Sequence, residues 1–227
     1  NNISADNDVI FADAGNDWLQ GGSGNDIILG GQDDDIAFSG QGDDLLWGDR
    51  GRDTLIGDNG NNVIYGGPAD PNPSEPDLGD LAYGGAGNDI LLGNRGNDSL
   101  AGGDGKDLLY GGRDNDLLYG DAGNDFLYGD KGNDTLCAGD GDDTLYGGTG
   151  SDIGIGQNGE QDFLHGGAGN DIIFGSEGDD RLDGDIGDDT LYGGKDNVIT
   201  SAKFLVLVHI SLQILPTVRI ILGWLVN

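Results

Sequence analysis

The sequence has few of the side chains that enzymes and transition-metal centres use. Its 227 residues include no methionine, one cysteine and two histidines. A single thiol excludes an internal disulfide, and this supply of sulfur and imidazole ligands is too small for a zinc site. Cations are also scarce, with ten lysines and arginines against 42 acidic residues and a formal net charge of −32. Such a charge opposes binding to nucleic acid.

The motifs of common hydrolase classes are missing as well. The chain contains neither an HExxH zinc motif nor a GxSxG nucleophile elbow, and two histidines are too few for general acid–base work. We therefore expect this chain not to be an enzyme. It begins at Asn1 without a methionine and shows no N-terminal signal peptide, which indicates a fragment of a longer polypeptide.

What the sequence has in abundance is glycine and aspartate, in a nine-residue period. Composition alone, with 47 glycines and 35% apolar residues, is typical of an acidic flexible polymer. The period overrides that interpretation, because segments such as GGSGNDIIL at 21–29 and GDAGNDFLY at 120–128 recur from Asp8 to Asp189. We number each repeat so that its first glycine is position one, which places an aspartate at position six.

Position six is an aspartate nineteen times, and Asn62 replaces it once. The phase shifts by a single inserted residue, in the segment GQNGEQDFLH at 156–165. The position-six aspartates are Asp8, Asp17, Asp26, Asp35, Asp44, Asp53, Asp80, Asp89, Asp98, Asp107, Asp116, Asp125, Asp134, Asp143, Asp152, Asp162, Asp171, Asp180 and Asp189.

Position eight is leucine or isoleucine in most repeats, so each repeat offers one side chain to a core. The short apolar run around it is closed on both sides by glycine-rich turns, which is too brief for a helix and fits a very short strand. Glycine at positions one, two and four suits backbone angles that other residues reach only at a cost. The sequence therefore predicts an all-β solenoid in which each repeat contacts its neighbours.

Stacked repeats would align the position-six carboxylates in columns, where like charges repel one another. Carboxylates and carbonyls in glycine-rich turns match the preference of Ca²⁺ for six to eight oxygen ligands. Any single aspartate could be only a turn former, but nineteen in phase favour a set of calcium ligands. We predict that all nineteen bind Ca²⁺, and that acidic residues at positions two and five, such as Asp121 and Asp43, are solvated turn residues.

The repeats resemble the hemolysin-type nonapeptide of the RTX family, GGxGxDxUx, over residues 3 to 194. This resemblance implies a right-handed parallel β-roll, in which two repeats make one turn and consecutive repeats lie on opposite sheets. It also implies that carboxylates eighteen residues apart share ions, as Asp98 with Asp116, with some gaps of nineteen caused by the inserted residue. Fifteen such pairs are complete in the sequence, which leads us to expect about 15 Ca²⁺ ions.

Residues 1–196 are expected to form one roll with a single interruption. Between Gly66 and Leu78, the segment PADPNPSEPDL replaces a repeat with prolines that cannot donate ladder hydrogen bonds. Because the phase is kept from Gly66 to Gly84, we interpret residues 67–78 as a loop extruded from the roll, with a linker between two rolls as the alternative. Asn62 and Pro71 then leave ion sites incomplete at both edges, which predicts a weak seam.

Positions seven and nine should face outward. Position nine is rich in aromatic residues, and we expect Tyr110, Tyr128 and Tyr146 in one column, with Trp47 and Tyr65 in the other. Such a stripe could bind sugars or a partner surface. Stacking of similar side chains between neighbouring strands is the favoured interpretation, and no protein partner is indicated.

Residues 197–227 differ from the repeats. They include no acidic residue and are strongly apolar from Phe204 onward, and residues 204–226 have the length of a membrane span. Pro216 and the charge of Arg219 argue against a span, so this tail is the only part expected to contact a membrane, if any does. Strands that cap the roll, and a reading-frame error or truncation, are the favoured alternatives.

Together these observations predict a calcium-binding repeat module of a secreted or cell-surface bacterial protein. Extracellular calcium modules work at about 10⁻⁴–10⁻³ M Ca²⁺, far above cytosolic levels, so the chain would fold after export. The resemblance implies type I export, although the tail differs from the C-terminal signal that this route reads. The alternative is the C-terminal repeat region of an RTX toxin (hemolysin) or secreted enzyme whose active domain is missing from this chain.

Overall fold

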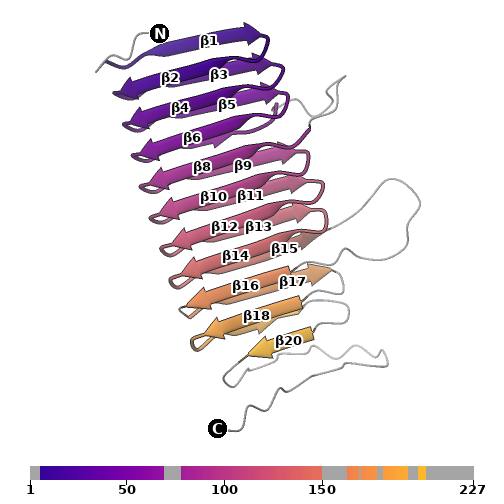
Figure 1. Ribbon diagram of the computed structural model, residues 1–227. Coiled ribbons are helices and arrows are strands. Elements are labelled where there is room, and N and C mark those ends of the chain that lie inside the picture. Colours follow the sequence, from indigo (N-terminus) through magenta and orange to yellow (C-terminus); the bar gives the residue numbers. More distant parts are fainter. Residues whose placement is uncertain are drawn as a thin grey trace, which may run out of the picture.

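The computed structural model describes residues 6–68, 78–149, 163–168, 170–177, 181–193 and 199–202. Within these ranges the chain forms twenty β-strands and no helix, stacked as Figure 1 shows. The strands are β1 (Val9–Ala14), β2 (Trp18–Ser23), β3 (Ile27–Gln32), β4 (Ile36–Gln41), β5 (Leu45–Arg50), β6 (Thr54–Asn59), β7 (Val63–Tyr65), β8 (Leu81–Ala86), β9 (Ile90–Arg95), β10 (Ser99–Asp104), β11 (Leu108–Arg113), β12 (Leu117–Ala122), β13 (Phe126–Lys131), β14 (Thr135–Asp140), β15 (Thr144–Thr149), β16 (Phe163–Ala168), β17 (Ile172–Glu177), β18 (Arg181–Ile186), β19 (Thr190–Tyr192) and β20 (Ile199–Ala202).

Consecutive strands lie in opposite sheets. The odd-numbered strands form one ten-stranded sheet from β1 to β19, and the even-numbered strands form the other from β2 to β20. Neighbouring strands within each sheet are parallel. Two repeats therefore make one coil, and the prediction of an all-β parallel β-roll is confirmed.

Most strands are longer than the sequence suggested. Strand β12, for example, has six residues and runs from position seven of one repeat to position three of the next. The glycines at positions one and two continue the ladder because their backbone still pairs with the neighbouring coil, as Gly103 pairs with Asp121. The turn that remains between two strands is only three residues long, at positions four to six.

The position-eight side chains form the core, as predicted. From Ile28 to Leu182 those that the structure describes are at most 1% exposed, and small residues at Ala37 and Ala82 are buried equally well. Positions seven and nine on either side point outward, which gives the alternation of buried and more exposed residues along each strand. The core is thus one cluster of apolar side chains between the two sheets, and each sheet contributes one side chain per coil.

The register between coils departs from the sequence period at two places. Most paired residues are eighteen apart, as Leu100 and Leu118 are. Leu55 instead pairs with Ala82, at a separation of 27, and Leu145 pairs with Ile173, at a separation of 28. The coils at these points therefore contain nine and ten residues more than a regular coil.

Both departures correct the sequence analysis. At the first, the coil that contains Asp53 is followed directly by the coil that contains Asp80, so Pro71 does not correspond to a ladder position. At the second, strand β15 pairs with β17 at a separation of 28, where the sequence analysis expected nineteen. The nine-residue period alone did not reveal these departures. Nine additional residues preserve the phase of the period, but they move every later repeat into the other sheet.

Glycine serves two different purposes in the repeat. Positions two and four have left-handed backbone angles, as Gly22 (φ 118°) and Gly24 (φ 117°) show, and Asp121 takes the same region at position two (φ 72°). The position-one glycines have ordinary backbone angles, but most of them have no room for a side chain: a Cβ atom at Gly120 would lie 2.6 Å from Oδ2 of Asp125. Ser39 and Ala138 are exceptions that carry a buried side chain at this position. The expectation that position one also needs unusual backbone angles was therefore wrong.

The position-nine aromatic residues of β11, β13, β15, β17 and β19 stack in a ladder on the outer face of the odd-numbered sheet. The rings of Tyr110, Tyr128, Tyr146, Phe174 and Tyr192 follow one another with centroids 4.7–4.8 Å apart and planes within 13° of parallel. Stacking between neighbouring strands, the favoured interpretation, is thus confirmed.

Trp47 and Tyr65 stack in the same way, with ring centroids 5.2 Å apart. They lie on β5 and β7, in the same sheet as the tyrosines on β11 to β15. The prediction that placed them in the other column was wrong, because the additional nine residues before β8 reverse the assignment of repeats to sheets.

Some predictions fall outside the described residues. These concern most of the proline-rich segment 67–78, the tail from residue 203 onward, and the ligands Asp152, Asp162 and Asp180. Among the residues that the structure does describe, no helix has the length and hydropathy needed to cross a membrane.

Candidate metal centre

The position-six residues form two columns, one at each edge of the roll where the chain passes between sheets. The even column precedes the even-numbered strands and contains Asp17, Asp35, Asp53, Asp80, Asp98, Asp116 and Asp134. The odd column precedes the odd-numbered strands and contains Asp8, Asp26, Asp44, Asn62, Asp89, Asp107, Asp125, Asp143, Asp171 and Asp189. From Asp26 to Asp171 these side chains are at most 3% exposed.

One oxygen of each carboxylate continues a hydrogen-bonded ladder along the column. The backbone N–H of Asp98 donates to Oδ1 of Asp116 over 2.8 Å, and the N–H of Asp116 donates to Oδ1 of Asp134 over 2.8 Å. The same link recurs through both columns at 2.6–3.1 Å, including across the two enlarged separations. Among the described residues there are thirteen Asp–Asp links, seven in the odd column and six in the even one.

The other oxygen has no hydrogen-bond donor. Oδ2 is buried without a donor in Asp26, Asp35, Asp44, Asp53, Asp80, Asp89, Asp98, Asp107, Asp116, Asp125, Asp134, Asp143 and Asp171. In most of these residues Oδ2 lies against a position-one glycine, and in several it also lies beside the position-one carbonyl oxygen of the next coil, as Oδ2 of Asp125 does with Gly120 and the oxygen of Ala138. Buried acceptors that face one another require a cation or a proton between them.

Burial makes the ionised form of these carboxyl groups costly. It raises the pKa of Asp116 to about 9, and a backbone hydrogen bond from Asp98 offsets only part of the effect. The pKa values of Asp107 and Asp143 are raised to about 7, and that of Asp125 to about 6, again mainly by burial. A bound cation would stabilise the ionised form and reverse this shift.

The donor chemistry fits Ca²⁺. Within the described ranges, no group of three or more histidine, cysteine, aspartate or glutamate side chains converges on one point. An ion between two coils would therefore take carboxylate oxygens from two neighbouring position-six aspartates and the rest from backbone carbonyls. A mixture of carboxylate and carbonyl oxygens suits a hard ion with flexible geometry, and it lacks the histidine and cysteine ligands of structural zinc sites.

A second ladder lies at position five, and the sequence analysis missed it. The N–H of Asn25 donates to Oδ1 of Asn7 over 2.9 Å, and the N–H of Asn61 donates to Oδ1 of Asp43 over 2.8 Å. Here the donor belongs to the later coil, whereas at position six it belongs to the earlier one. Asp43 and Asp142 are therefore exposed but hydrogen-bonded acceptors rather than merely solvated residues. The frequent asparagine at position five was the available signal.

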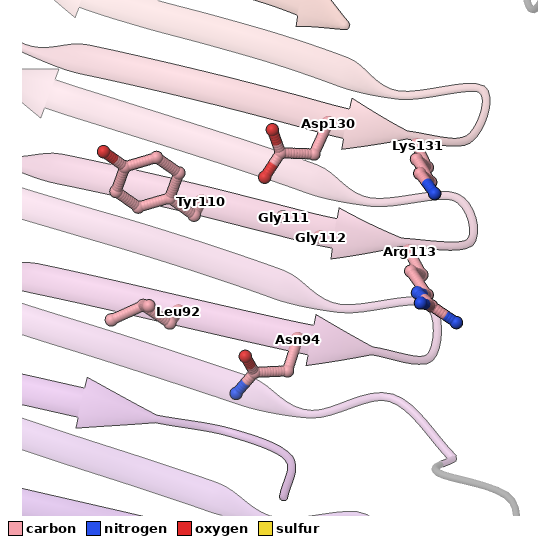
Figure 2. A pocket seen from close by; sticks show the side chains of 8 residues that line it. All are labelled: Leu92, Asn94, Tyr110, Gly111, Gly112, Arg113, Asp130 and Lys131. Atoms are coloured by element: carbon pink, nitrogen blue, oxygen red, sulfur yellow. The ribbon is translucent and has the colours of Figure 1, made fainter. Parts of the chain in front are cut away.

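A groove on the outer face of the odd-numbered sheet is separate from the columns. It has a volume of about 450 Å³ and is lined by Leu92, Asn94, Tyr110, Gly111, Gly112, Arg113, Asp130 and Lys131. Figure 2 shows that Gly111 and Gly112 form its floor, with Arg113 and Lys131 near the strand ends. Arg95, Arg113 and Lys131 occupy paired positions on three adjacent strands.

The comparison with known families agrees with this geometry. The model of the RTX calcium-binding nonapeptide repeat, described as four copies, matches residues 3–37, 38–70, 83–118, 101–136, 119–154, 137–163, 157–191 and 165–199. The matches span most of the chain, which therefore belongs to the RTX calcium-binding nonapeptide repeat family. No curated protein matches the sequence. The chain is thus a calcium-binding repeat module built as a parallel β-roll.

Proposed function

We propose that this module folds when it binds Ca²⁺, with the position-six aspartates of the two columns as its ligands. The observation that carries the proposal is the set of thirteen buried Oδ2 atoms that lack a donor. Without a cation, each of these oxygens would make the folded state less stable, because a buried unsatisfied acceptor costs about 1–3 kcal/mol. With Ca²⁺ between the coils, the same oxygens become ligands.

The proposal extends to where the protein works. An ion-free chain with a net charge of −32 has strong internal repulsion, and its repeats each bury one apolar side chain. It would remain unfolded at cytosolic Ca²⁺ and fold at the about 10⁻⁴–10⁻³ M found outside the cell. This supports a part in a secreted or cell-surface protein, with ion-driven folding rather than catalysis as the role of this chain.

Far-UV circular dichroism of the full chain during a Ca²⁺ titration tests the proposal. We expect a cooperative gain of β-sheet signal, reversed by a chelator, and little response to Mg²⁺, which favours a smaller and stricter octahedral site. A β-rich spectrum that is unchanged by Ca²⁺ and chelator would show that the aspartate columns are only turn formers, and the proposal would be wrong.

A further inference from the structure

Asn62 stands in the odd column where every other described member is an aspartate. Its Oδ1 accepts the backbone N–H of Asp44 over 3.1 Å, and its own N–H donates to Oδ1 of Asp89 over 2.6 Å. The backbone ladder therefore passes through Asn62 without a break. The side chain is fully buried, like its neighbours in the column.

The amide nitrogen of Asn62 occupies the place that Oδ2 has in an aspartate. A Cβ atom at Gly57 would lie 2.6 Å from Nδ2 of Asn62 and 2.5 Å from the carbonyl oxygen of Gly84. In the regular repeat, a Cβ atom at Gly120 would lie 2.6 Å from Oδ2 of Asp125 and 2.5 Å from the carbonyl oxygen of Ala138. The two arrangements coincide, with a donor in place of an acceptor.

This exchange changes the chemistry of the turn. Nδ2 of Asn62 donates to the carbonyl oxygens of Gly60 and Gly84, at 3.3 Å each. The same kind of carbonyl faces a carboxylate oxygen elsewhere, where both atoms are acceptors. At Asn62 the buried polar atoms are neutral and paired within the protein, so this position has no need of a cation.

We propose that the Asn62 amide takes the place of one Ca²⁺ ion, so that neighbouring coils are connected at this position without metal. This inference rests on the proposed function, because it presumes that the aspartate positions bind Ca²⁺. The location of Asn62 suggests what this metal-free connection contributes. Asn62 lies in the coil where β6 and β7 pair with β8 and β9 across separations of 27 residues, and closing a longer connection costs more conformational entropy.

The first test counts bound ions by native mass spectrometry of the full chain at saturating Ca²⁺. Asn62→Asp should bind at least one Ca²⁺ more than the natural chain, because it restores a carboxylate. Asn59→Asp is the matched control: it adds the same charge on an exposed side chain of the same coil and should leave the count unchanged. An unchanged count in Asn62→Asp would overturn the inference, whereas a natural chain that binds no Ca²⁺ would overturn the proposed function itself.

A second test introduces an asparagine at another position of the odd column, and it keeps the inference testable if Asn62→Asp does not fold. Asp107→Asn should lower the ion count by at least one, yet it should fold at the same or a lower Ca²⁺ concentration than the natural chain. Asp107→Ala removes the acceptor of the Asp89 N–H and should need several-fold more Ca²⁺ to fold. If the asparagine and alanine variants need equally raised Ca²⁺, the amide does not replace the ion.

Discussion

The backbone N–H of Asp98 donates a 2.8 Å hydrogen bond to Oδ1 of Asp116, while Oδ2 of the same carboxylate is buried without a donor. One side chain thus connects two coils through its first oxygen and leaves its second oxygen for a cation. Because the arrangement repeats along both edges, stability and metal binding depend on the same set of atoms.

Replacing Asp116 by alanine should therefore weaken the roll in two ways. It leaves the buried N–H of Asp98 without its acceptor, which costs about 1–3 kcal/mol of the free energy of unfolding, and it removes a ligand. We expect a lower melting temperature at saturating Ca²⁺, measured by circular dichroism. Asp140→Ala, at an exposed strand end, is the control and should change stability by about 0.5 kcal/mol or less. Equal melting temperatures for the two variants would contradict the ladder.

Glycine should be needed at most position-one sites because a Cβ atom has no room there, and not because of the backbone angles. Gly120→Ala places a Cβ 2.6 Å from Oδ2 of Asp125 and 2.5 Å from a backbone oxygen, and overpacking of this kind typically costs about 1–3 kcal/mol. Ala138→Gly is the opposite exchange at a position-one alanine and should cost about 0.5–1 kcal/mol. Chemical unfolding at saturating Ca²⁺ measures both. A Gly120→Ala variant as stable as the natural chain would show that the coil can expand.

Protons should partly replace Ca²⁺. The pKa of Asp116 is raised to about 9 and those of Asp107 and Asp143 to about 7, from 3.8 in each case, with burial as the main cause. A raised pKa means that the folded state binds protons more tightly than the unfolded chain. The resulting stability is complete below about pH 4 and is lost as the pH rises through about 7 to 9.

Lowering the pH of a Ca²⁺-free solution from 8 to 5 should thus increase the β-sheet signal in circular dichroism. Added NaCl at pH 8 is the control, because salt screens buried charges only weakly, and it should restore less signal than acid does. A Ca²⁺-free chain whose signal falls on acidification would contradict the pKa shifts.

Removing residues 69–77 should leave the roll intact. The deletion joins Gly66, Gly67 and Pro68 to Leu78, Gly79 and Asp80, so that six residues connect β7 to β8. It restores a separation of eighteen between Asp53 and its ladder partner Asp80. We expect an unchanged ion count and a melting temperature within a few degrees, because doubling the length of a connection costs only about 0.6 kcal/mol.

The matched control deletes nine residues from a regular region, 102–110, which removes Asp107 and the buried Leu109. That variant should bind fewer ions and melt at a lower temperature, because it also shifts the later aromatic residues into the other sheet. If both deletions lower the ion count equally, the register across residues 69–77 is wrong.

Much of the site could be predicted because every regular repeat makes the same contacts with the neighbouring coils. Leu109 and Leu118 had to be core residues, since each is the central apolar residue of a short strand between glycine turns. Asp107 and Asp125 had to be neighbours wherever the regular spacing holds. The position-five ladder and the steric role of Gly120 could not be predicted, because they depend on which atoms of adjacent coils approach one another.

The sequence by itself determined the period, the core residues at position eight, the two acidic columns and the choice of Ca²⁺, because these follow from the residue types at fixed positions. The tertiary structure decided which coil follows which across residues 69–77 and 150–162. It also decided that Trp47 shares a sheet with Tyr110 and that the Asn62 amide replaces a carboxylate oxygen. These relationships depend on which coils pair through their backbones. Nine additional residues keep the phase of the repeat, but they change the coil with which each later strand pairs.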